Sequence, residues 1–255
     1  MVKTVTFQAK KQLYIVDTVR ELNELTQAGV SVIPEYHYAA CEGSPDEKNI
    51  QLSDYDSEGV LWPHTDHLIV DFEQVDNEYL YRIYQRLNNE PWTILETEHF
   101  IVRETTVSDV DDFYRIYSEP SITEYIEPLF DNPENERLYT RNYIKDIYGF
   151  YGFGMWSVID KSTNVVVGRA GVSMIDGYDY PELGFLMDNA YQHKGYTFEV
   201  VSAIMEYSKN ELEFSTIQAR VKPDNLRSIK LLERLGFNIP HTLHQEHLIA
   251  LHTFS

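Results

Sequence analysis

The chain has 255 residues, of which 43% are apolar and 24% charged. This length fits one large domain or two modest ones, and the composition excludes wholesale disorder and fibrous architectures. The 21 Lys and Arg residues against 41 Asp and Glu give a formal charge of −20. Because such a field repels phosphate backbones and anionic lipid, we expect neither nucleic-acid nor membrane binding.

The chain lacks the sequence features of a secreted or membrane-anchored protein. Cys41 is the sole cysteine, so no intrachain disulfide can form, and we expect an inert loop thiol. The opening MVKTVTFQAKK has no apolar signal-peptide core, and no apolar run approaches the roughly 20 residues that span a bilayer. We therefore expect a cytoplasmic protein.

Residues 1–97 read as a small α/β domain. TVRELNELTQAG has the apolar spacing of a helix, with Asp17 or Thr18 as N-cap and Gly29 as its end. The pattern further predicts, in chain order, a strand over VSVIPEYH, a long polar loop over residues 41–59, a strand over HLIVDF and a helix over DNEYLYRIYQRLNN. PWTILETEHF is the best candidate for a domain boundary, as a packed connection.

Residues 98–255 read as a second, larger α/β domain. From Phe100 onward the pattern predicts a strand, two helices, three strands, a helix, a strand, a helix and a closing strand. Ser108 is the expected N-cap of the first of these helices.

The strongest local signal is ELGFLMDNAYQHKGYTFEVV, a strand, a short loop and a long helix. Gln192, Lys194 and Gly195 form the loop, where backbone amides and a helix N-terminus converge on a site suited to an anion such as pyrophosphate. By itself this pattern is equally typical of an ordinary strand–helix joint. One strand later, PDNLRSIKLLERLGF places Asn225 as an N-cap with Ser228 one turn on.

Together these two segments resemble the GNAT superfamily of acetyl-CoA-dependent N-acetyltransferases, and within it the ribosomal-protein N-acetyltransferase branch. The resemblance covers residues 98–255 and implies a mixed, mostly antiparallel central sheet flanked by helices. Gln192, Lys194 and Gly195 match the family's pyrophosphate loop, whereas Thr197 departs from its last small residue. The implied acetyl-CoA contacts are Phe185, Leu186, Met187, Gln192, His193, Lys194, Gly195, Tyr196, Thr197, Asn225 and Ser228.

The resemblance also suggests catalytic roles for the transfer of an acetyl group from a thioester to an amine. An amine arrives mostly protonated, so a base must remove a proton, and Glu182 is the candidate, acting directly or through water. A backbone N–H of Leu186 or Met187 would stabilise the oxyanion. Leu232 stands where many relatives carry a tyrosine acid, and Ser228 is the substitute for stabilising the thiolate.

By the same resemblance, we expect the acceptor to be a primary amine, on a small molecule or a peptide end. Glu124, Tyr125, Phe150, Tyr151 and Phe153 are the candidate walls of its cleft, with core packing as the alternative for each aromatic residue. Glu124 or Glu127 would pair with a cation. The histidine spacing supports no metal site.

Other readings remain open at this point. The rival function is a non-catalytic acyl-CoA sensor or interaction module, motivated by Leu232 and Thr197. Residues 1–97 faintly resemble the later half of haloacid-dehalogenase-like hydrolases, but no Asp-x-Asp nucleophile motif precedes Asp17. A scaffold, homodimerisation or acceptor-recognition role is left for this domain.

Overall fold

The computed structural model describes residues 2–36, 38–40, 50–52, 56–65, 67–192 and 194–254. The chain divides into two compact units, residues 1–90 and 91–255. The division lies a few residues before the expected boundary at Thr97, because the intervening residues belong to the larger unit's sheet.

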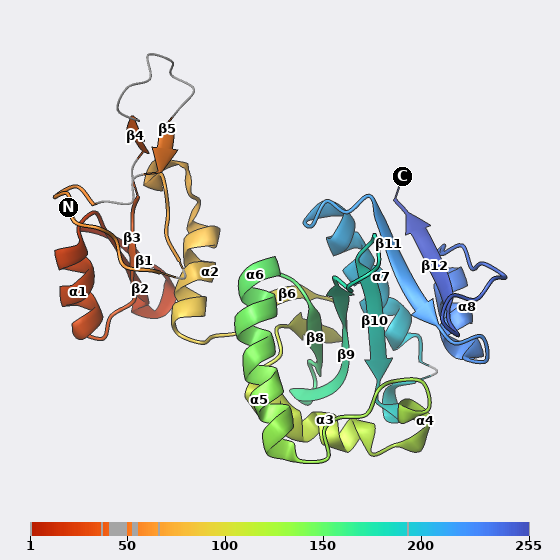
Figure 1. Cartoon of the computed structure of the whole chain (residues 1–255). Helices are drawn as coiled ribbons and strands as arrows, with labels where there is room; N and C mark the ends of the chain where they lie inside the picture. Colours follow the sequence, from red (N-terminus) through yellow and green to blue (C-terminus); the bar gives the residue numbers. More distant parts are fainter. Residues whose placement is uncertain are drawn as a thin grey trace. The chain divides into compact units, whose positions relative to one another are not determined.

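The first unit is a small α/β structure (Figure 1). Its three-stranded sheet has the order β1-β2-β3, with β1–β2 antiparallel and β2–β3 parallel. Leu13, Ile15, Ile33, Leu80 and Ile83 form its buried core. The elements are β1 Lys3–Thr6, β2 Gln12–Val16, α1 Val19–Gln27, β3 Val32–Pro34, β4 Tyr38–Ala40, β5 Ile50–Leu52 and α2 Asn77–Leu87.

The helices of this unit are confirmed, and one strand is wrong. Thr18 caps α1 by accepting a hydrogen bond from the Glu21 backbone N–H at 3.2 Å. In HLIVDF, Ile69 forms only an isolated bridge with Glu35. Within the expected polar loop, residues 50–52 form β5, which pairs with β4. Cys41 lies outside the described residues.

The described part of the second unit holds a seven-stranded sheet of order β12-β11-β10-β9-β8-β7-β6. All neighbouring strands are antiparallel except β10 and β11. This confirms the expected mixed, mostly antiparallel sheet. The strands are β6 Thr93–Glu96, β7 Phe100–Arg103, β8 Met155–Asp160, β9 Val165–Ser173, β10 Glu182–Met187, β11 Thr216–Val221 and β12 Leu248–Thr253.

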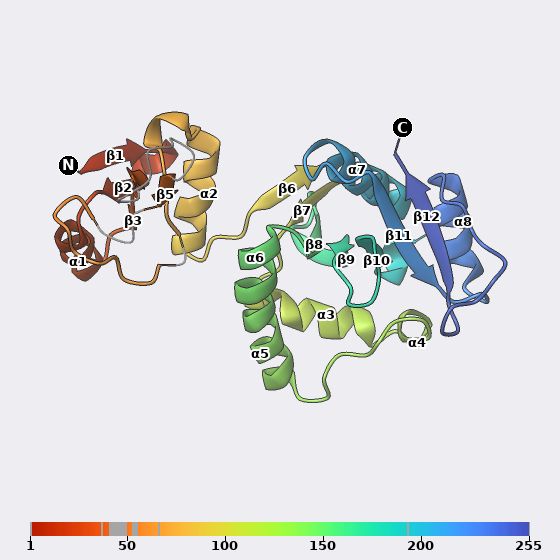
Figure 2. The ribbon, with the colours of Figure 1, turned by 45° about the horizontal axis from the view of Figure 1, so that its top comes forward.

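Helices cover both faces of this sheet (Figure 2). On one face α3 packs Phe113 and Ile116 against Leu186, and on the other α7 packs Val200, Val201 and Ile204 into the main core. Alternation along β10 explains this division, because successive side chains of a strand point to opposite faces. The helices are α3 Val110–Tyr117, α4 Pro120–Thr123, α5 Pro133–Tyr143, α6 Gly149–Tyr151, α7 Tyr196–Asn210 and α8 Leu226–Arg234, with a π-helix over Ile144–Tyr148 between α5 and α6.

Helix caps refine the sequence prediction. Asn225 is confirmed as the N-cap of α8, because its side chain accepts from the Ser228 backbone N–H at 3.1 Å. Ser108 is wrong as the cap before α3. Thr106 begins that segment, and its N–H donates to the Asp109 carboxylate at 2.9 Å. Every helix in the described stretches is too short or too polar to cross a bilayer.

Candidate active site

The sheet opens between β10 and β11. Only Glu182 and Gln218 pair across these strands in the described sheet, whereas β10 pairs with β9 at six positions. Figure 1 shows β11 turning away from β10 beyond this junction. The opening leaves main-chain hydrogen-bonding groups of both strands without a strand partner, which is the arrangement that receives an extended ligand.

Hydrogen-bond alternation identifies which main-chain groups of β10 face the opening. The Asp188 N–H donates to the Val167 carbonyl at 2.8 Å, so the even-numbered residues of β10 bond to β9. Phe185 and Met187 therefore direct their N–H and C=O groups toward β11. Leu186 directs its main chain toward β9, so it is poorly placed to stabilise an oxyanion in the opening.

The N-terminus of α7 borders the opening. Gly195 precedes the helix in the left-handed region, with φ +84°, which favours glycine. No side chain among the described residues caps this helix, and the first N–H groups of a helix have no acceptor within it. Gln192 fixes the loop by donating to the Met187 carbonyl at 3.0 Å and accepting from Arg227 at 3.1 Å. Anions bind favourably at such a terminus.

The N-terminus of α8 lies on the other side of the opening. The Ser228 hydroxyl lines the cavity, and no described residue forms a hydrogen bond with it. The Ser228 hydroxyl is therefore not hydrogen-bonded to the backbone of its own helix. Leu232 is 1% exposed and belongs to the core.

These elements enclose a cavity of about 1630 Å³. The side of the cavity next to α8 is locally basic, although the chain has a net charge of −20. Arg234 on this side stacks 3.6 Å from the centre of the Phe198 ring. This side therefore suits an anionic ligand despite the overall charge. The basic residues that line it are Lys222, Arg227, Lys230 and Arg234.

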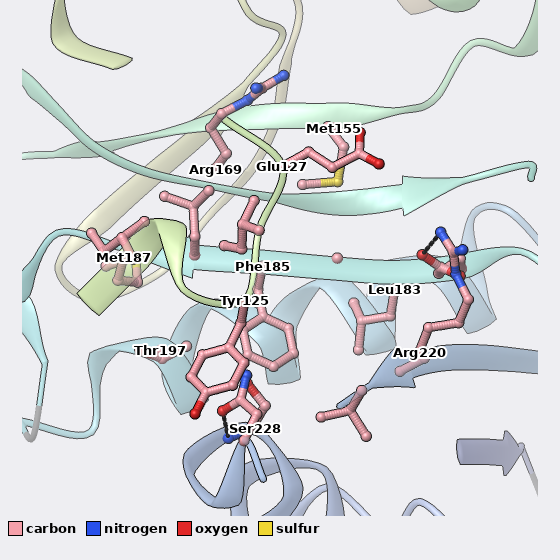
Figure 3. Close-up of a pocket in the computed structure, with 18 of the residues that line it drawn as sticks. Tyr125, Glu127, Met155, Arg169, Leu183, Phe185, Met187, Thr197, Arg220 and Ser228 are labelled. Atoms are coloured by element: carbon pink, nitrogen blue, oxygen red, sulfur yellow. Dashed lines mark hydrogen bonds and ion pairs between the residues drawn. The ribbon is translucent and has the colours of Figure 1, made fainter. Parts of the chain in front are cut away.

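The segment after α4 crosses the opening. Figure 3 shows Tyr125 lying over Phe185, with its hydroxyl directed toward Ser228. Burial and the nearby carboxylates of Asp224 and Glu124 raise the pKa of Tyr125, so its phenol is neutral. Its hydroxyl donates a hydrogen bond to the Glu124 side chain. Glu124 and Tyr125, two of the predicted acceptor residues, both line the cavity.

Glu182 also lines the cavity, but its carboxylate is engaged. Arg220 Nε donates to one carboxylate oxygen, and an Arg220 terminal nitrogen donates to the other at 3.0 Å. A bidentate pair of this kind is strong and directional. To accept a proton, Glu182 would first have to release Arg220.

Glu127 is differently placed. It lines the cavity beside Met155 (Figure 3). The strand register places Met155 on the sheet face that carries Glu182 and Gly184. Among the described residues, no ion pair or hydrogen bond holds its carboxylate. The Met155 side chain covers Gly184, since a Cβ at Gly184 would lie 3.0 Å from the Met155 sulfur.

The remaining predicted aromatic residues divide into three groups. Tyr151 and Phe153 line the cavity, and Phe153 is also 8% exposed and part of the core. Phe150 is 80% exposed and outside the cavity lining. Tyr196 packs edge-on against Phe100 at 5.1 Å.

The predicted cofactor residues also differ in position. Phe185, Leu186, Met187, Gln192, Gly195, Thr197, Asn225 and Ser228 all line the cavity. Lys194 instead lies 5.8 Å from the Tyr191 ring centre, outside the lining. His193 falls outside the described residues.

Sequence reasoning missed part of the cavity lining near Glu127 and Phe153, a region called the acceptor side below. Arg169 of β9 and Tyr139 and Tyr143 of α5 line this part of the cavity. A signal existed for Arg169, because it interrupts the apolar strand VVVGRAGV, and a charge inside a buried strand needs a reason. Within the described residues, no cluster of His, Cys, Asp and Glu suited to a metal ion is found.

Comparison with known proteins gives this site a family. The model of the acetyltransferase (GNAT) domain matches residues 99–238. An uncharacterized N-acetyltransferase, p20, of Bacillus licheniformis is 31% identical over 146 residues, which are 56% of this chain and 81% of that protein. These matches support the resemblance of residues 98–255 to acetyltransferases. They give no support to the hydrolase resemblance of residues 1–97.

Solved structures share the fold. A ribosomal-protein-alanine acetyltransferase from Vibrio fischeri has a TM-score of 0.53 at 18% identity, covering 62% of this chain and 95% of the other. The ribosomal-protein α-N-acetyltransferase RimL in complex with coenzyme A has a TM-score of 0.53 at 14% identity, covering 63% and 96%. With the family model matching more than half of its residues over the opened sheet and both helix N-termini, this chain belongs to the GNAT family of acetyltransferases.

Proposed function

We propose that this protein transfers the acetyl group of acetyl-CoA to a primary amine, on a small molecule or a peptide N-terminus. The observation that carries the proposal is the opening between β10 and β11, bordered by the N-termini of α7 and α8. The fold neighbour that holds coenzyme A supports the choice of cosubstrate.

The chain's own residues fit this cosubstrate in three places. The free N–H groups at the start of α7, with Thr197 beside them, suit the pyrophosphate. The N–H and C=O groups of Phe185 and the N–H of Met187 suit an amide-containing arm that bonds like a strand. Arg227 and Lys230 line the basic side, which suits the remaining phosphate.

Transfer requires a proton acceptor for the amine. The amine nitrogen forms a bond to the acetyl carbon, the carbon–sulfur bond breaks, and one amine proton leaves. Glu182 was the sequence candidate, but Arg220 occupies both of its oxygens. The geometry favours Glu127 as the base, because its carboxylate has no described partner and lines the acceptor side.

The departing thiolate takes a proton or a hydrogen bond. Ser228 lines the cavity with its hydroxyl free of described partners, so it can donate a hydrogen bond. Tyr125 directs a second hydroxyl toward the same place (Figure 3), but this hydroxyl would have to release Glu124 before it could donate there. Ser228 is therefore the hydrogen-bond donor that takes the place of the acid that the buried Leu232 cannot supply.

Thiol release from acetyl-CoA tests the proposal, with polyamines, aminoglycosides and N-terminal peptides as acceptors. We expect acceptor-dependent release of free coenzyme A and a higher unfolding temperature with coenzyme A present. Stabilisation by coenzyme A without turnover of any amine would instead indicate an acyl-CoA sensor. Absence of both effects would refute the assignment.

A further inference from the structure

One arginine stands among aromatic side chains on the acceptor side of the cavity. Arg169 extends from β9 on the same sheet face as Leu186, its register partner on β10. Its guanidinium carbon lies 4.6 Å from the centre of the Phe113 ring. The Tyr117 hydroxyl is its hydrogen-bond partner, and its Nε is buried without one. The hydrogen-bonding capacity of this guanidinium is therefore incompletely used.

Arg169 lacks the carboxylate that neighbouring arginines have. Arg103 pairs with Asp109 at 2.7 Å, and Arg220 pairs with Glu182. Over the described ranges, no Asp or Glu forms an ion pair with Arg169. A sheltered charge without a counter-charge is costly, and a ligand anion would remove that cost.

The surroundings of Arg169 keep it charged and add hydrogen-bond donors. Burial acts to lower the pKa of Arg169, but the hydroxyls of Tyr117, Tyr148 and Tyr143 outweigh it and raise the pKa. The Tyr143 hydroxyl accepts from the Met155 N–H at 2.8 Å, so its own proton remains available to a ligand. A guanidinium with phenolic donors beside it is suited to a carboxylate.

We propose that the acceptor carries a carboxylate as well as the amine that is acetylated, and that Arg169 binds it with Tyr117 and Tyr143. This inference rests on the proposed function. A carboxylate fits better than a phosphate dianion, because Glu127 and Glu136 also line this side and repel a second negative charge.

The strand order sets the separation between the two groups of the acceptor. Arg169 lies on β9, and the opening lies beyond β10, so about two strand spacings, roughly 9–10 Å, separate them. The carboxylate is therefore several bonds away from the amine. An ω-amino acid fits this spacing, and so does a peptide N-terminus followed by an acidic side chain.

Two pairs of acceptors of matched size test this inference. The first pair is 6-aminohexanoate and 6-aminohexanamide, and the second is the peptides Ala-Asp-Ala-amide and Ala-Asn-Ala-amide. We expect kcat/KM to favour the carboxylate member of at least one pair by about 10- to 100-fold, the range of a charged hydrogen-bonded contact. The favoured pair distinguishes the small molecule from the peptide source.

Variants of Arg169 test whether this residue causes the preference for the carboxylate acceptor. Arg169→Met should raise KM for the carboxylate acceptor until the preference disappears, with little change for the amide. Arg169→Lys keeps the charge but loses the planar guanidinium, so it should retain part of the carboxylate preference. A retained partial preference would show that the loss in Arg169→Met is not a folding defect. The control is Arg141→Met, an exposed α5 residue outside the cavity lining, which should retain the full preference.

A binding measurement keeps the inference separate from the proposed function. With coenzyme A present, 6-acetamidohexanoate should raise the unfolding temperature of the wild type more than 6-acetamidohexanamide, and the difference should vanish in Arg169→Met. Equal effects of both members in turnover and in binding would overturn the carboxylate site, even if acetyl transfer itself is found. Failure of coenzyme A to stabilise the protein would count against the proposed function instead.

Discussion

At the scale of single residues, two carboxylates that line the cavity differ in availability. Glu182 is held by Arg220 through both oxygens, whereas Glu127 has no described partner. We expect Glu127→Gln to lower kcat/KM by about 10²- to 10⁴-fold, the usual contribution of a general base. Glu182→Gln should cost less, because the amide still accepts one hydrogen bond from Arg220. Steady-state thiol release measures both, and a larger loss in Glu182→Gln would restore Glu182 as the base.

A second prediction at this scale concerns Asp160 at the end of β8. Hydrogen bonds from Ser162, and then from the Tyr191 hydroxyl at 2.6 Å, lower the pKa of Asp160 to about 2. Because the folded-state pKa lies below the ordinary 3.8, the carboxylate stabilises the fold above pH 3.8, and this contribution is lost as the pH falls toward 2.

Thermal unfolding between pH 7 and 2.5 checks this sign. Asp160→Asn should unfold at a lower temperature than the wild type at pH 7, and the two curves should converge in acid. Asp146→Asn, at an exposed aspartate without a described partner, serves as the control and should follow the wild type throughout. A constant gap across the whole pH range would contradict the assignment.

At the scale of elements, the turn before α7 combines a backbone requirement with a binding surface. Gly195 has φ +84°, and no atom lies within 4 Å of the place that a Cβ would occupy, so a valine would meet strain but no clash at its Cβ. Gly59 in the first unit has φ +78° and equally open space. Both Gly195→Val and Gly59→Val should lower the free energy of unfolding by about 1–3 kcal/mol.

Ligand affinity separates these two variants. Gly195→Val should weaken coenzyme A binding by roughly 10-fold or more, about the value of one charge-assisted contact, because it displaces the N–H groups at the start of α7. Gly59→Val should bind like the wild type. Titration calorimetry measures both affinities, and equal binding by both variants would show that the turn does not contact the cosubstrate.

The elements also show what the sequence can and cannot reveal. The apolar spacing of α1 and α7 is a local pattern, so both helices were predicted well. Helix α4 has four residues, Pro120–Thr123, too few to show a period. The strand over residues 67–72 was wrong because an apolar run alone does not supply a neighbouring strand.

The residues of the acceptor side could not be predicted from local sequence patterns, because tertiary packing brings them together. Arg169 comes from a strand, Tyr143 from a helix and Glu127 from the segment after α4, and the fold brings them to one cavity. Pairing likewise decided the state of Glu182, since Arg220 is 38 residues away in the chain. Residue type and spacing suggested the chemistry, but the partners of each group required the fold.

At the scale of the whole molecule, the position of the unit boundary has a measurable consequence. Strand β6, Thr93–Glu96, pairs with β7 and belongs to the larger unit's sheet. A chain of residues 91–255 should therefore fold cooperatively and bind coenzyme A. A chain of residues 98–255 loses this edge strand, uncovers β7 and should unfold at a lower temperature or aggregate.

Circular dichroism melts and coenzyme A titrations compare the two truncations with the full chain. Retained acetyl transfer by residues 91–255 would place the chemistry in the larger unit alone. Loss of acceptor turnover with coenzyme A binding intact would assign acceptor recognition to residues 1–90. Equal stability of the two truncations would show that β6 contributes nothing to the fold.

The single junction between Glu182 and Gln218 interrupts the hydrogen-bond ladder of the large sheet. Strands β6 to β10 form one hydrogen-bonded plate, and β11 with β12 forms another. One buried core holds the two together, because apolar residues of β8, β9 and β10 and those of β11 and β12 belong to the same cluster. An elongated guest bonded to both rims would supply the hydrogen bonds that β10 and β11 do not exchange beyond this junction.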